Sequence, residues 1–269
     1  MPDVTRVTMV GGGVMGGAIV DGLLALGEVE VSIVEADPDR ARSWKNRAGV
    51  TVVELREGIA DADVVFLAVK PHQIVDVLTS AVTAFSPGTI VVSIAAGVPL
   101  EVLEQHVPAG VRVVRTMPNM PMRVGRGVVG MSAGSGCEAP QVDLVRKLLE
   151  PVALVVPVPE ELLDSLTAAS GSGPAYVFYL AEAMKLGAID LGLSEEMANT
   201  LVAETIMGAA LLLIERPDDA VGLRASITSK GGTTAAATAV FDEADVRGIV
   251  IRAMHANRNR ARELADESR

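Results

Sequence analysis

The sequence has too few cysteines for a disulfide-bonded protein, no excess of positive charge for binding a polyanion, and no signal peptide. It has a single cysteine, Cys137, and therefore cannot form an internal disulfide. Its net charge is −11, which argues against nucleic acid or an anionic membrane surface as a partner. Its first residues do not show the basic stretch and apolar stretch of a signal peptide. We therefore expect a cytoplasmic protein that binds neither nucleic acid nor membrane.

Aromatic residues and histidines are also scarce. With aromatics at 3%, the core has to be built mainly from aliphatic side chains. The three histidines, His72, His106 and His255, have no Asp, Glu or Cys at the spacing of a metal site or a catalytic triad. We therefore expect no metal, and we interpret each histidine, like Cys137, as structural.

A glycine-rich stretch near the N-terminus organises the chain. An apolar strand expected at 6–10 runs into Gly11-x-Gly13-x-x-Gly16, and a helix is expected at 15–26. Gly11 permits a tight turn, Gly13 lets the backbone approach a pyrophosphate, and Gly16 lets helix and strand pack closely. The N-terminus of the helix then points its free N–H groups at the phosphates. The pattern predicts a dinucleotide site.

A second strand, expected at 30–34, ends in Glu35 at the distance from the loop that this fingerprint requires. An acid at this position accepts hydrogen bonds from the ribose 2′-hydroxyl and repels a 2′-phosphate, which favours NADH. Arg40 and Arg42 lie near enough in sequence to complicate that preference, and use of NADPH stays open. The other interpretation is that Glu35 caps the turn before Asp37.

Residues 1–160 alternate between short apolar strands and helices. Strands are expected at 6–10, 30–34, 50–53, 64–68, 89–94 and 112–117, and helices at 15–26, 38–48, 72–84 and 99–105. Continuous apolar strands are buried on both faces, as in a parallel sheet. We predict an α/β fold class, with an N-terminal Rossmann-type, doubly wound, mostly parallel sheet that two more strands at 128–132 and 153–156 complete.

Ligands of such a sheet bind beyond the carboxyl ends of its strands. The predicted cofactor-binding residues lie there or in the glycine loop: Gly11, Gly13, Val14, Met15, Glu35, Ala68, Val69, Lys70, Pro71, Ala95, Ala96 and Asn119. For Lys70 the alternative is a solvated surface lysine. For Asn119 the alternative is a rigid turn fixed by the two neighbouring prolines.

Residues 161–269 show helical periodicity throughout. A long apolar helix is expected at 174–191, ended by Gly192, and Ser194 is expected to cap the helix that follows. That second helix carries an apolar run at 206–214 with no polar face, and such a helix has to be buried. We predict that two copies of the helical domain bury it in a dimer. The alternative is burial within the same chain.

A second ligand site is predicted between two helices of this domain. Residues 229–234 read Ser-Lys-Gly-Gly-Thr-Thr and place small residues and two hydroxyls at a helix N-terminus. The free backbone N–H groups of such a terminus attract an anion, so the segment indicates a carboxylate pocket. The alternative is a plain capped loop.

Taken together, six motifs resemble those of the pyrroline-5-carboxylate reductase family. They are Gly11-x-Gly13-x-Met15-Gly16, Ala68-Val69-Lys70-Pro71, 92–98, 115–119, 170–176 and Ser229-x-Gly231-Gly232-Thr233-Thr234. The resemblance is collinear from the first strand to the last helix. It implies a Rossmann domain followed by a helical dimerisation domain, often in larger rings of dimers. It also implies reduction of the cyclic imine 1-pyrroline-5-carboxylate to L-proline, the last step of proline biosynthesis, with NADPH or NADH.

The resemblance places the substrate on the last motif. Its carboxylate would be held by the backbone N–H groups of Ser229, Gly231, Gly232, Thr233 and Thr234, and Thr234 would act as the catalytic residue by hydrogen-bonding the ring nitrogen. The imine nitrogen is readily protonated, which makes the adjacent carbon electrophilic, so the enzyme has mainly to position that carbon. This suits a sequence without a triad.

Several positions depart from the family pattern. They are Val14, where asparagine is usual, Leu55, Asp219-Ala220, Ala225 and Lys230. Lys230 stands where the family has proline, at the rim of the substrate loop, and leaves open the reduction of a related cyclic imine acid.

Two other functions stay open. The first is a hydroxy-acid dehydrogenase of the same architecture, with Lys185 as its catalytic lysine. The second is a nucleotide-binding regulator without catalysis, of which the changes at Asp219, Ala225 and Lys230 would be the signature.

Overall fold

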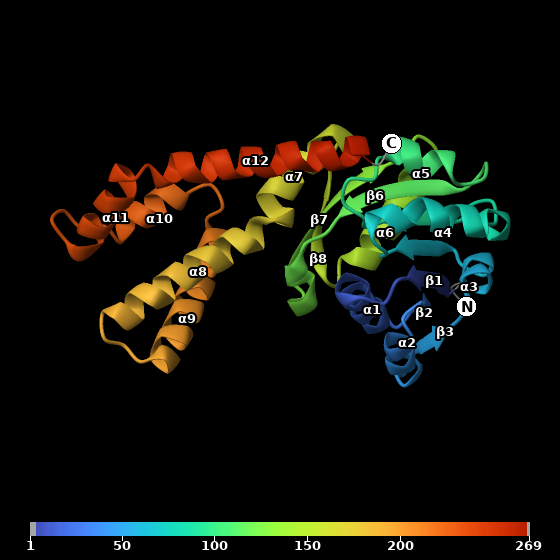
Figure 1. The fold of residues 1–269 in the computed structure, drawn as a ribbon, viewed down its shortest axis with the longest axis horizontal. Coiled ribbons are helices and arrows are strands. Elements are labelled where there is room, and N and C mark those ends of the chain that lie inside the picture. The colour runs from blue at the N-terminus through green and yellow to red at the C-terminus, as the bar shows by residue number, and fades with distance from the viewer. Residues whose placement is uncertain (1–3, 268–269) are drawn as a thin grey trace. The chain divides into compact units, whose positions relative to one another are not determined.

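The computed structural model describes residues 4–267, which divide by contact into two compact units (Figure 1). Unit 1 comprises the chain up to Ser172 together with the residues from Asn257 onward, and unit 2 is Gly173–Ala256. The sequence predicted a domain boundary after residue 160. The boundary between the two units lies later in the chain, after Ser172, and the residues from Asn257 onward belong to unit 1 again.

Unit 1 is built on an eight-stranded sheet with the order β3-β2-β1-β4-β5-β6-β7-β8. Its strands are β1 (Thr5–Val10), β2 (Val29–Val34), β3 (Val50–Val52), β4 (Val64–Leu67), β5 (Ile90–Ser93), β6 (Arg112–Met117), β7 (Gly127–Ala133) and β8 (Ala153–Pro157). Neighbouring strands are parallel except for the antiparallel pair β6 and β7. The predicted mostly parallel sheet is confirmed, and β7 and β8 complete it.

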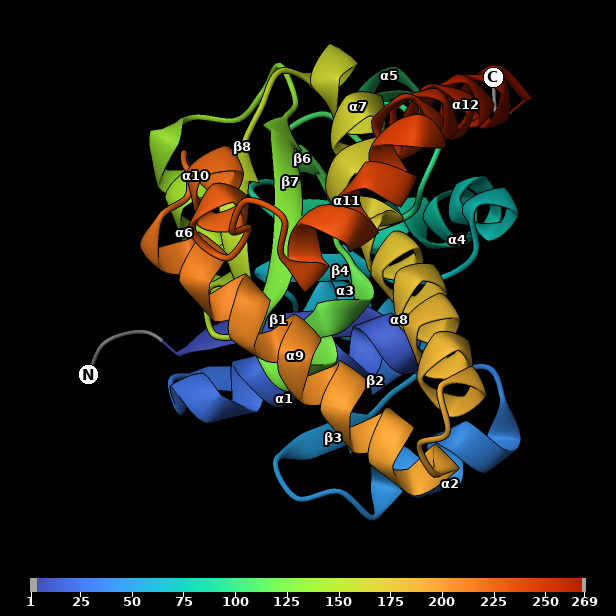
Figure 2. The same cartoon turned by 90° about the vertical axis from the view of Figure 1, so that its left-hand side faces the viewer.

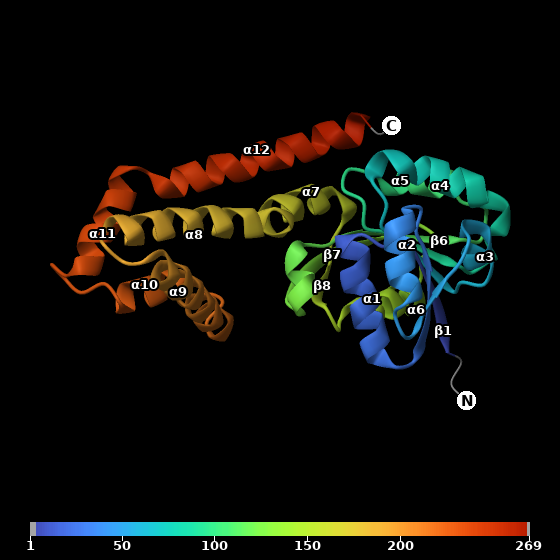
Figure 3. The ribbon, with the colours of Figure 1, turned by 60° about the horizontal axis from the view of Figure 1, so that its bottom comes forward.

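Helices cover both faces of this sheet (Figure 3). One face carries α1 (Val14–Leu26), α2 (Pro38–Lys45) and α6 (Ala139–Leu149), and the other carries α3 (Leu55–Ala60), α4 (Ile74–Ala81) and α5 (Leu100–Gln105). The sequence analysis missed α3, which has six residues, contains Gly58 and is too short to show a helical period. The helix expected at 72–84 is α4 flanked by the 3-10 turns η1 (Pro71–Gln73) and η2 (Val82–Ala84).

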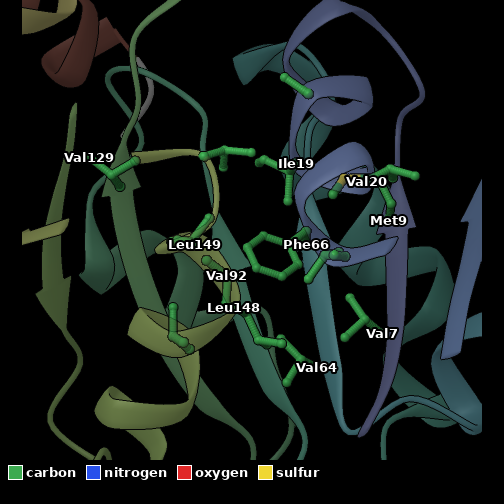
Figure 4. Packing of buried hydrophobic residues seen from close by; sticks show 14 of the residues in the cluster. Val7, Met9, Ile19, Val20, Val64, Phe66, Val92, Val129, Leu148 and Leu149 are labelled. Carbon is green, nitrogen blue, oxygen red and sulfur yellow. The ribbon is translucent and has the colours of Figure 1, made fainter. Parts of the chain in front are cut away.

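The central strand β4 explains why the core has two halves. Val64 and Phe66 pack with α1 and α6, as Figure 4 shows for Phe66 and its neighbours Ile19 and Leu148. The alternating side chains of Val65 and Leu67 point to the other face and belong to a second cluster of buried residues, under α4 and α5. Successive side chains of a strand point to opposite faces, so an unbroken apolar run fits a strand that is covered on both sides.

A missing side chain on β7 lets the next helix lie close to the sheet. A Cβ at Gly130 would lie 2.7 Å from Leu166 Cδ1 and 2.9 Å from Leu163 Cδ2. Both leucines belong to α7 (Leu163–Leu166), which the 3-10 turn η4 (Glu160–Leu162) precedes and the π-helical turn η5 (Thr167–Gly171) follows. This packing attaches the residues up to Ser172 to unit 1 and moves the contact boundary past residue 160.

Unit 2 is helical. It contains α8 (Gly173–Asp190), α9 (Glu195–Glu215), α10 (Ala220–Ser226), α11 (Thr233–Glu243) and the first part of α12 (Val246–Glu267), which continues into unit 1. Helices α8 and α9 pack together as a hairpin (Figure 2). The predicted cap of α9 is confirmed, because Ser194 Oγ accepts a hydrogen bond of 3.2 Å from the Met197 N–H.

The apolar helix α9 is not buried by its own chain. Its buried residues are Ala198 and Val202, whereas Leu211, Leu212, Leu213 and Ile214 are exposed. Burial within the same chain, the alternative considered for this helix, is therefore wrong. A contiguous apolar surface of this kind marks a contact with another molecule.

Candidate functional site

The strand register brings the predicted cofactor residues to one edge of the sheet. Val10 is paired with Val34 on one side and with Leu67 on the other, so Gly11, Glu35 and Ala68 follow neighbouring strand ends. Ala95 lies beyond the end of β5, which is paired with β4. These residues come from distant parts of the sequence and meet only because the strands are parallel.

Close backbone contacts account for two glycines of the loop. Gly11 has φ +104°, and a Cβ on it would lie 2.7 Å from the carbonyl oxygen of Ala68. A Cβ on Gly16 would collide with the carbonyl oxygen of Gly11. By contrast, nothing lies within 4 Å of a Cβ built on Gly13. The backbone at Gly13 is therefore open, as the approach of a pyrophosphate requires.

A hollow of about 500 Å³ adjoins this loop. It is lined by residues 12–14 and by Gly17, Arg40, Trp44, Arg47 and Arg123. Val14, the first residue of α1, is 61% exposed. An open glycine loop, a helix N-terminus and arginines around one hollow fit a dinucleotide, which would lie on the loop and present its reactive ring beyond the strand ends.

Glu35 is held from several sides. Its Oε2 accepts hydrogen bonds from the Gly12 N–H over 2.9 Å and from Arg40 Nε over 3.0 Å. Its Oε1 accepts from the Asp37 N–H over 2.8 Å and from Arg40 Nη2 over 3.1 Å. Burial alone would raise the pKa of Glu35, but the hydrogen bonds from Arg40, Asp37 and Gly12 outweigh burial and hold the pKa below its usual value. The alternative in which Glu35 caps the turn before Asp37 is confirmed.

The sequence analysis missed Trp44, which completes the hollow. Its Nε1–H donates to the carbonyl oxygen of Gly12 over 3.1 Å, and the Arg47 guanidinium lies 5.3 Å from the centroid of its ring. Arg47 also pairs with Asp21. The only signal in the sequence was that Trp44 is the sole tryptophan of the chain, on a helix that follows Glu35.

Asn119 is buried, and its side chain serves the fold. Nδ2 donates to the carbonyl oxygen and to the hydroxyl of Ser170, each over 3.1 Å, and Oδ1 accepts from the Val128 N–H over 2.8 Å. The side chain thereby joins the segment after β6 to β7 and to η5. Its contact with a cofactor stays a prediction, as do those of Met15, Val69, Lys70, Pro71 and Ala96. Of the last four, Lys70, Pro71 and Ala96 are exposed.

The predicted carboxylate pocket lies in unit 2, between α10 and α11. Gly231 has φ +74°, a conformation that L side chains avoid, and a Cβ on Gly232 would collide with the hydroxyl of Ser229. Gly232 is the N-cap of α11 and supplies no side-chain cap. The first-turn N–H groups, including those of Thr233 and Thr234, therefore remain available to an anion.

Lys230 is exposed on the same turn, and no ion pair to it occurs among residues 4–267. Lys185 lies in the helical hairpin, in a hollow of about 350 Å³ lined also by Glu182 and Glu195. Within the described part of the chain, no group of three or more His, Cys, Asp or Glu could hold a metal ion. Cys137 is half-buried and its Sγ donates to the Val113 carbonyl oxygen over 3.1 Å, a packing role.

Comparisons with known proteins follow the division between sheet and helices. Residues 160–264 match the family model described as pyrroline-5-carboxylate reductase dimerisation. Residues 6–97 match the model described as NADP oxidoreductase, coenzyme F420-dependent.

Similar proteins span nearly the whole chain. A pyrroline-5-carboxylate reductase of Corynebacterium melassecola is 36% identical over 266 residues, which cover 97% of this chain and 98% of that protein. The solved structure of a Coxiella burnetii pyrroline-5-carboxylate reductase has a TM-score of 0.90 at 37% identity and covers 97% and 99% of the two chains. A Plasmodium falciparum pyrroline carboxylate reductase with NADP bound has a TM-score of 0.87 at 23% identity, with 98% and 99% covered.

Proposed function

We propose, from the premise that this chain belongs to the pyrroline-5-carboxylate reductase family, that residues 229–234 hold the substrate and that Thr234 contacts its ring nitrogen. The chain is an oxidoreductase that reduces the C=N bond of 1-pyrroline-5-carboxylate with NADPH or NADH and forms L-proline. The resemblance noted in the sequence is thereby confirmed.

The first turn of α11 carries this substrate site. Its N–H groups have no side-chain cap, and the preceding turn contains Gly231 in the left-handed region and Gly232 against Ser229. Such a turn presents several N–H donors and the positive end of a helix dipole to one small anion. A carboxylate of the imine is an anion of that size, and two hydroxyls, those of Thr233 and Thr234, stand beside it.

When bound, the dinucleotide supplies a hydride to the imine carbon. The chain's own residues have to hold that carbon in reach, exclude water and keep the ring nitrogen protonated. The Thr234 hydroxyl would accept a hydrogen bond from the protonated ring nitrogen, and this favours the electrophilic iminium form. The backbone N–H groups of residues 231–234 would fix the carboxylate, so that the ring has one orientation. No further acid or base is required, in agreement with histidines that serve no triad.

The activity is tested by following the absorbance of NADPH and NADH with five-membered and six-membered cyclic imine carboxylates. For Thr234→Ala we expect kcat/KM to fall about 10- to 100-fold, because one hydrogen bond to a charged group is lost. Thr234→Ser should restore most of it. Thr228→Ala is the matched control, since the Thr228 hydroxyl is spent on the Arg224 carbonyl oxygen. Unchanged kcat/KM in Thr234→Ala would remove this residue from the mechanism.

Lys230 decides whether the preferred imine is 1-pyrroline-5-carboxylate or a related ring. An exposed cation beside the first turn of α11 adds attraction for a second anionic group on the substrate. Comparing Lys230→Pro with the unmodified enzyme across the five-membered and six-membered imines shows whether Lys230 changes which ring is preferred. A hydroxy-acid dehydrogenase would instead oxidise hydroxy acids and lose activity in Lys185→Ala, and a regulator would bind nucleotide without turnover.

The helical unit self-associates, because it matches a dimerisation family and leaves α9 exposed. We propose a dimer that can assemble into a ring of dimers, in the cytoplasm, without nucleic-acid or membrane partners. Helix α9 is also long and apolar enough to cross a membrane. Its place in a helical hairpin within a dimerisation family supports a partner-covered helix instead. Sedimentation of the purified protein without detergent tests whether it forms the proposed oligomer and whether it stays in solution without a membrane.

A further inference from the structure

The acceptor positions of the Glu35 carboxylate are all taken within the chain. An ionised carboxylate has two oxygens with about four positions for hydrogen bonds. Here each oxygen accepts two, from the N–H groups of Gly12 and Asp37 and from two nitrogens of Arg40, over 2.8 to 3.1 Å. The Glu35 side chain is only 4% exposed. A ribose hydroxyl of a dinucleotide would therefore find no free acceptor on it.

We propose that Glu35 positions the glycine loop instead of binding ribose, and that Arg40 makes the enzyme prefer NADPH to NADH by pairing with the 2′-phosphate. An acid at the end of the second strand usually signals NADH, because it accepts from the 2′-hydroxyl and repels a phosphate. In this chain the acid is neutralised by a cation that stands between it and the hollow.

The exposed fractions of the Arg40 and Glu35 side chains show which of the two faces the hollow. Arg40 is 55% exposed and lines the hollow, whereas Glu35 lies beneath it. An incoming phosphate meets the guanidinium first, and a guanidinium can hold phosphate oxygens with paired N–H donors. Asp37, whose Oδ2 lies 3.5 Å from Arg40 Nη1, is the other carboxylate in contact with this cation.

The remaining charges of the hollow point the same way. Three arginines line it, Arg40, Arg47 and Arg123, against the single carboxylate of Asp21, so the lining is positively charged. Arg47 is paired with Asp21, and no ion pair to Arg123 occurs among residues 4–267. In a chain with a net charge of −11, this positive lining is a local exception. A phosphate is attracted to it, whereas an uncharged hydroxyl is not.

The loop itself is held through Gly12. Its N–H donates to Glu35, its carbonyl oxygen accepts from Trp44, and a Cβ on it would collide with the indole. Glu35 and Trp44 therefore fix the same peptide from two sides. Removing the Glu35 charge should therefore weaken the binding of NADPH and of NADH alike. The ratio of the two affinities should not change.

A binding experiment tests the proposal on the unmodified enzyme. Trp44 is the only tryptophan and lies at the hollow, so its fluorescence reports binding without turnover. We expect NADPH to bind about 10- to 100-fold more tightly than NADH, the effect of one added charged pair. We also expect 2′,5′-ADP to compete better than 5′-AMP. Equal competition by the two nucleotides would overturn the role of Arg40.

Variants separate the two residues. In Arg40→Met the NADPH preference should be lost and NADH binding kept, because Glu35 regains free acceptors. In Glu35→Gln both dinucleotides should weaken by a similar factor. Arg42→Ala is the control, since Arg42 lies on the same helix, is 74% exposed, pairs with Asp39 and is absent from the lining. A Glu35→Gln enzyme that loses NADH binding alone and gains NADPH preference would contradict the proposal.

Thermal melting accompanies each variant, and Arg40→Lys, which keeps the charge, should retain part of the preference. If Glu35→Gln does not fold, Arg40→Met and the nucleotide competition still decide. These measurements need only a dinucleotide, so they are independent of the substrate residues in unit 2. The choice of cofactor and the choice of imine can therefore fail separately.

Discussion

The indole N–H of Trp44 donates a hydrogen bond to the carbonyl oxygen of Gly12 over 3.1 Å, across the variable position between the first two glycines of the loop. The fingerprint Gly-x-Gly-x-x-Gly accepts any residue at that position. Here the ring occupies the space in which a side chain would lie. The loop of this enzyme therefore depends on a residue from α2.

Gly12→Ala should lower the free energy of unfolding by about 1–3 kcal/mol, because an added methyl group overpacks the site. The methyl would collide with the indole and lie 2.9 Å from Ile33 Cδ1. Urea unfolding followed by circular dichroism measures this. In a Trp44→Phe background, which removes the contact with the indole N–H, the same substitution should cost less. Equal cost in both backgrounds would show that the indole is not the obstacle.

Gly13→Ala provides the opposite pattern. Nothing lies within 4 Å of a Cβ at Gly13, so the substitution should leave stability nearly unchanged. The methyl group would instead enter the space where the pyrophosphate approaches the backbone. We expect dinucleotide binding to weaken at least about 10-fold, an effect that corresponds to about 1.4 kcal/mol. Titration by tryptophan fluorescence checks this, and undiminished affinity would argue against a pyrophosphate at the loop.

Glu35 should make stability depend on pH. Its pKa is lowered in the folded protein, because hydrogen bonds from Arg40, Asp37 and Gly12 outweigh the opposing effect of burial. The folded state then holds fewer protons on this group than the unfolded state. The stabilisation is present above the ordinary glutamate pKa and is lost as the pH falls through the lowered value.

Urea unfolding of the unmodified enzyme and of Glu35→Gln, from about pH 7 to about pH 3, measures this effect. The two proteins should differ at neutral pH and converge toward the acid end. A constant difference over the whole range would mean that the Glu35 charge contributes no stability. Glu161→Gln, a substitution of an exposed residue in unit 1, provides the comparison.

Asn119→Ala should destabilise unit 1 by about 2–4 kcal/mol, because it leaves the partly buried Val128 N–H without its acceptor and removes two hydrogen bonds to Ser170. At about 2–4 °C per kcal/mol for a protein of this size, the melting temperature should fall by several degrees. Asn46→Ala, at an exposed asparagine, is the control. A normal melting temperature with weakened cofactor binding would instead support the predicted cofactor contact of Asn119.

Leu211→Glu on α9 should shift the protein toward monomers, because it places a charge on an exposed apolar surface that another copy covers in the proposed dimer. The melting temperature of the unmodified protein should rise with concentration, and that of the variant should do so less. Sedimentation velocity measures the oligomer directly. Leu154→Glu is the control, since Leu154 is also an exposed leucine (67%, against 51% for Leu211) but lies on the edge strand β8 of unit 1. Dissociation in both variants would point to general destabilisation.

Local chemistry explains why much of the fold is predictable from the sequence. Continuous apolar strands such as β4 require a sheet covered on both faces, and glycines at 11, 13 and 16 permit one loop geometry. Ser194 caps α9 through a contact three residues away. The sequence misplaced what depends on weak local signals. The short helix at 55–60 was missed, and the helix expected at 72–84 is shorter than predicted, with a 3-10 turn at each end.

Only the tertiary structure decided which groups the Glu35 carboxylate binds, and that the apolar residues of α9 are exposed instead of being buried by the same chain. The sequence by itself determined the class of ligand, because loop glycines, parallel strands and an uncapped turn at 229–234 act through the backbone nearby. The pairing of Glu35 with Gly12 and the contact of Trp44 with the same glycine need a strand register and a helix position. Side chains that are distant in sequence interact only after the core has packed, and for this reason their roles could not be read from spacing.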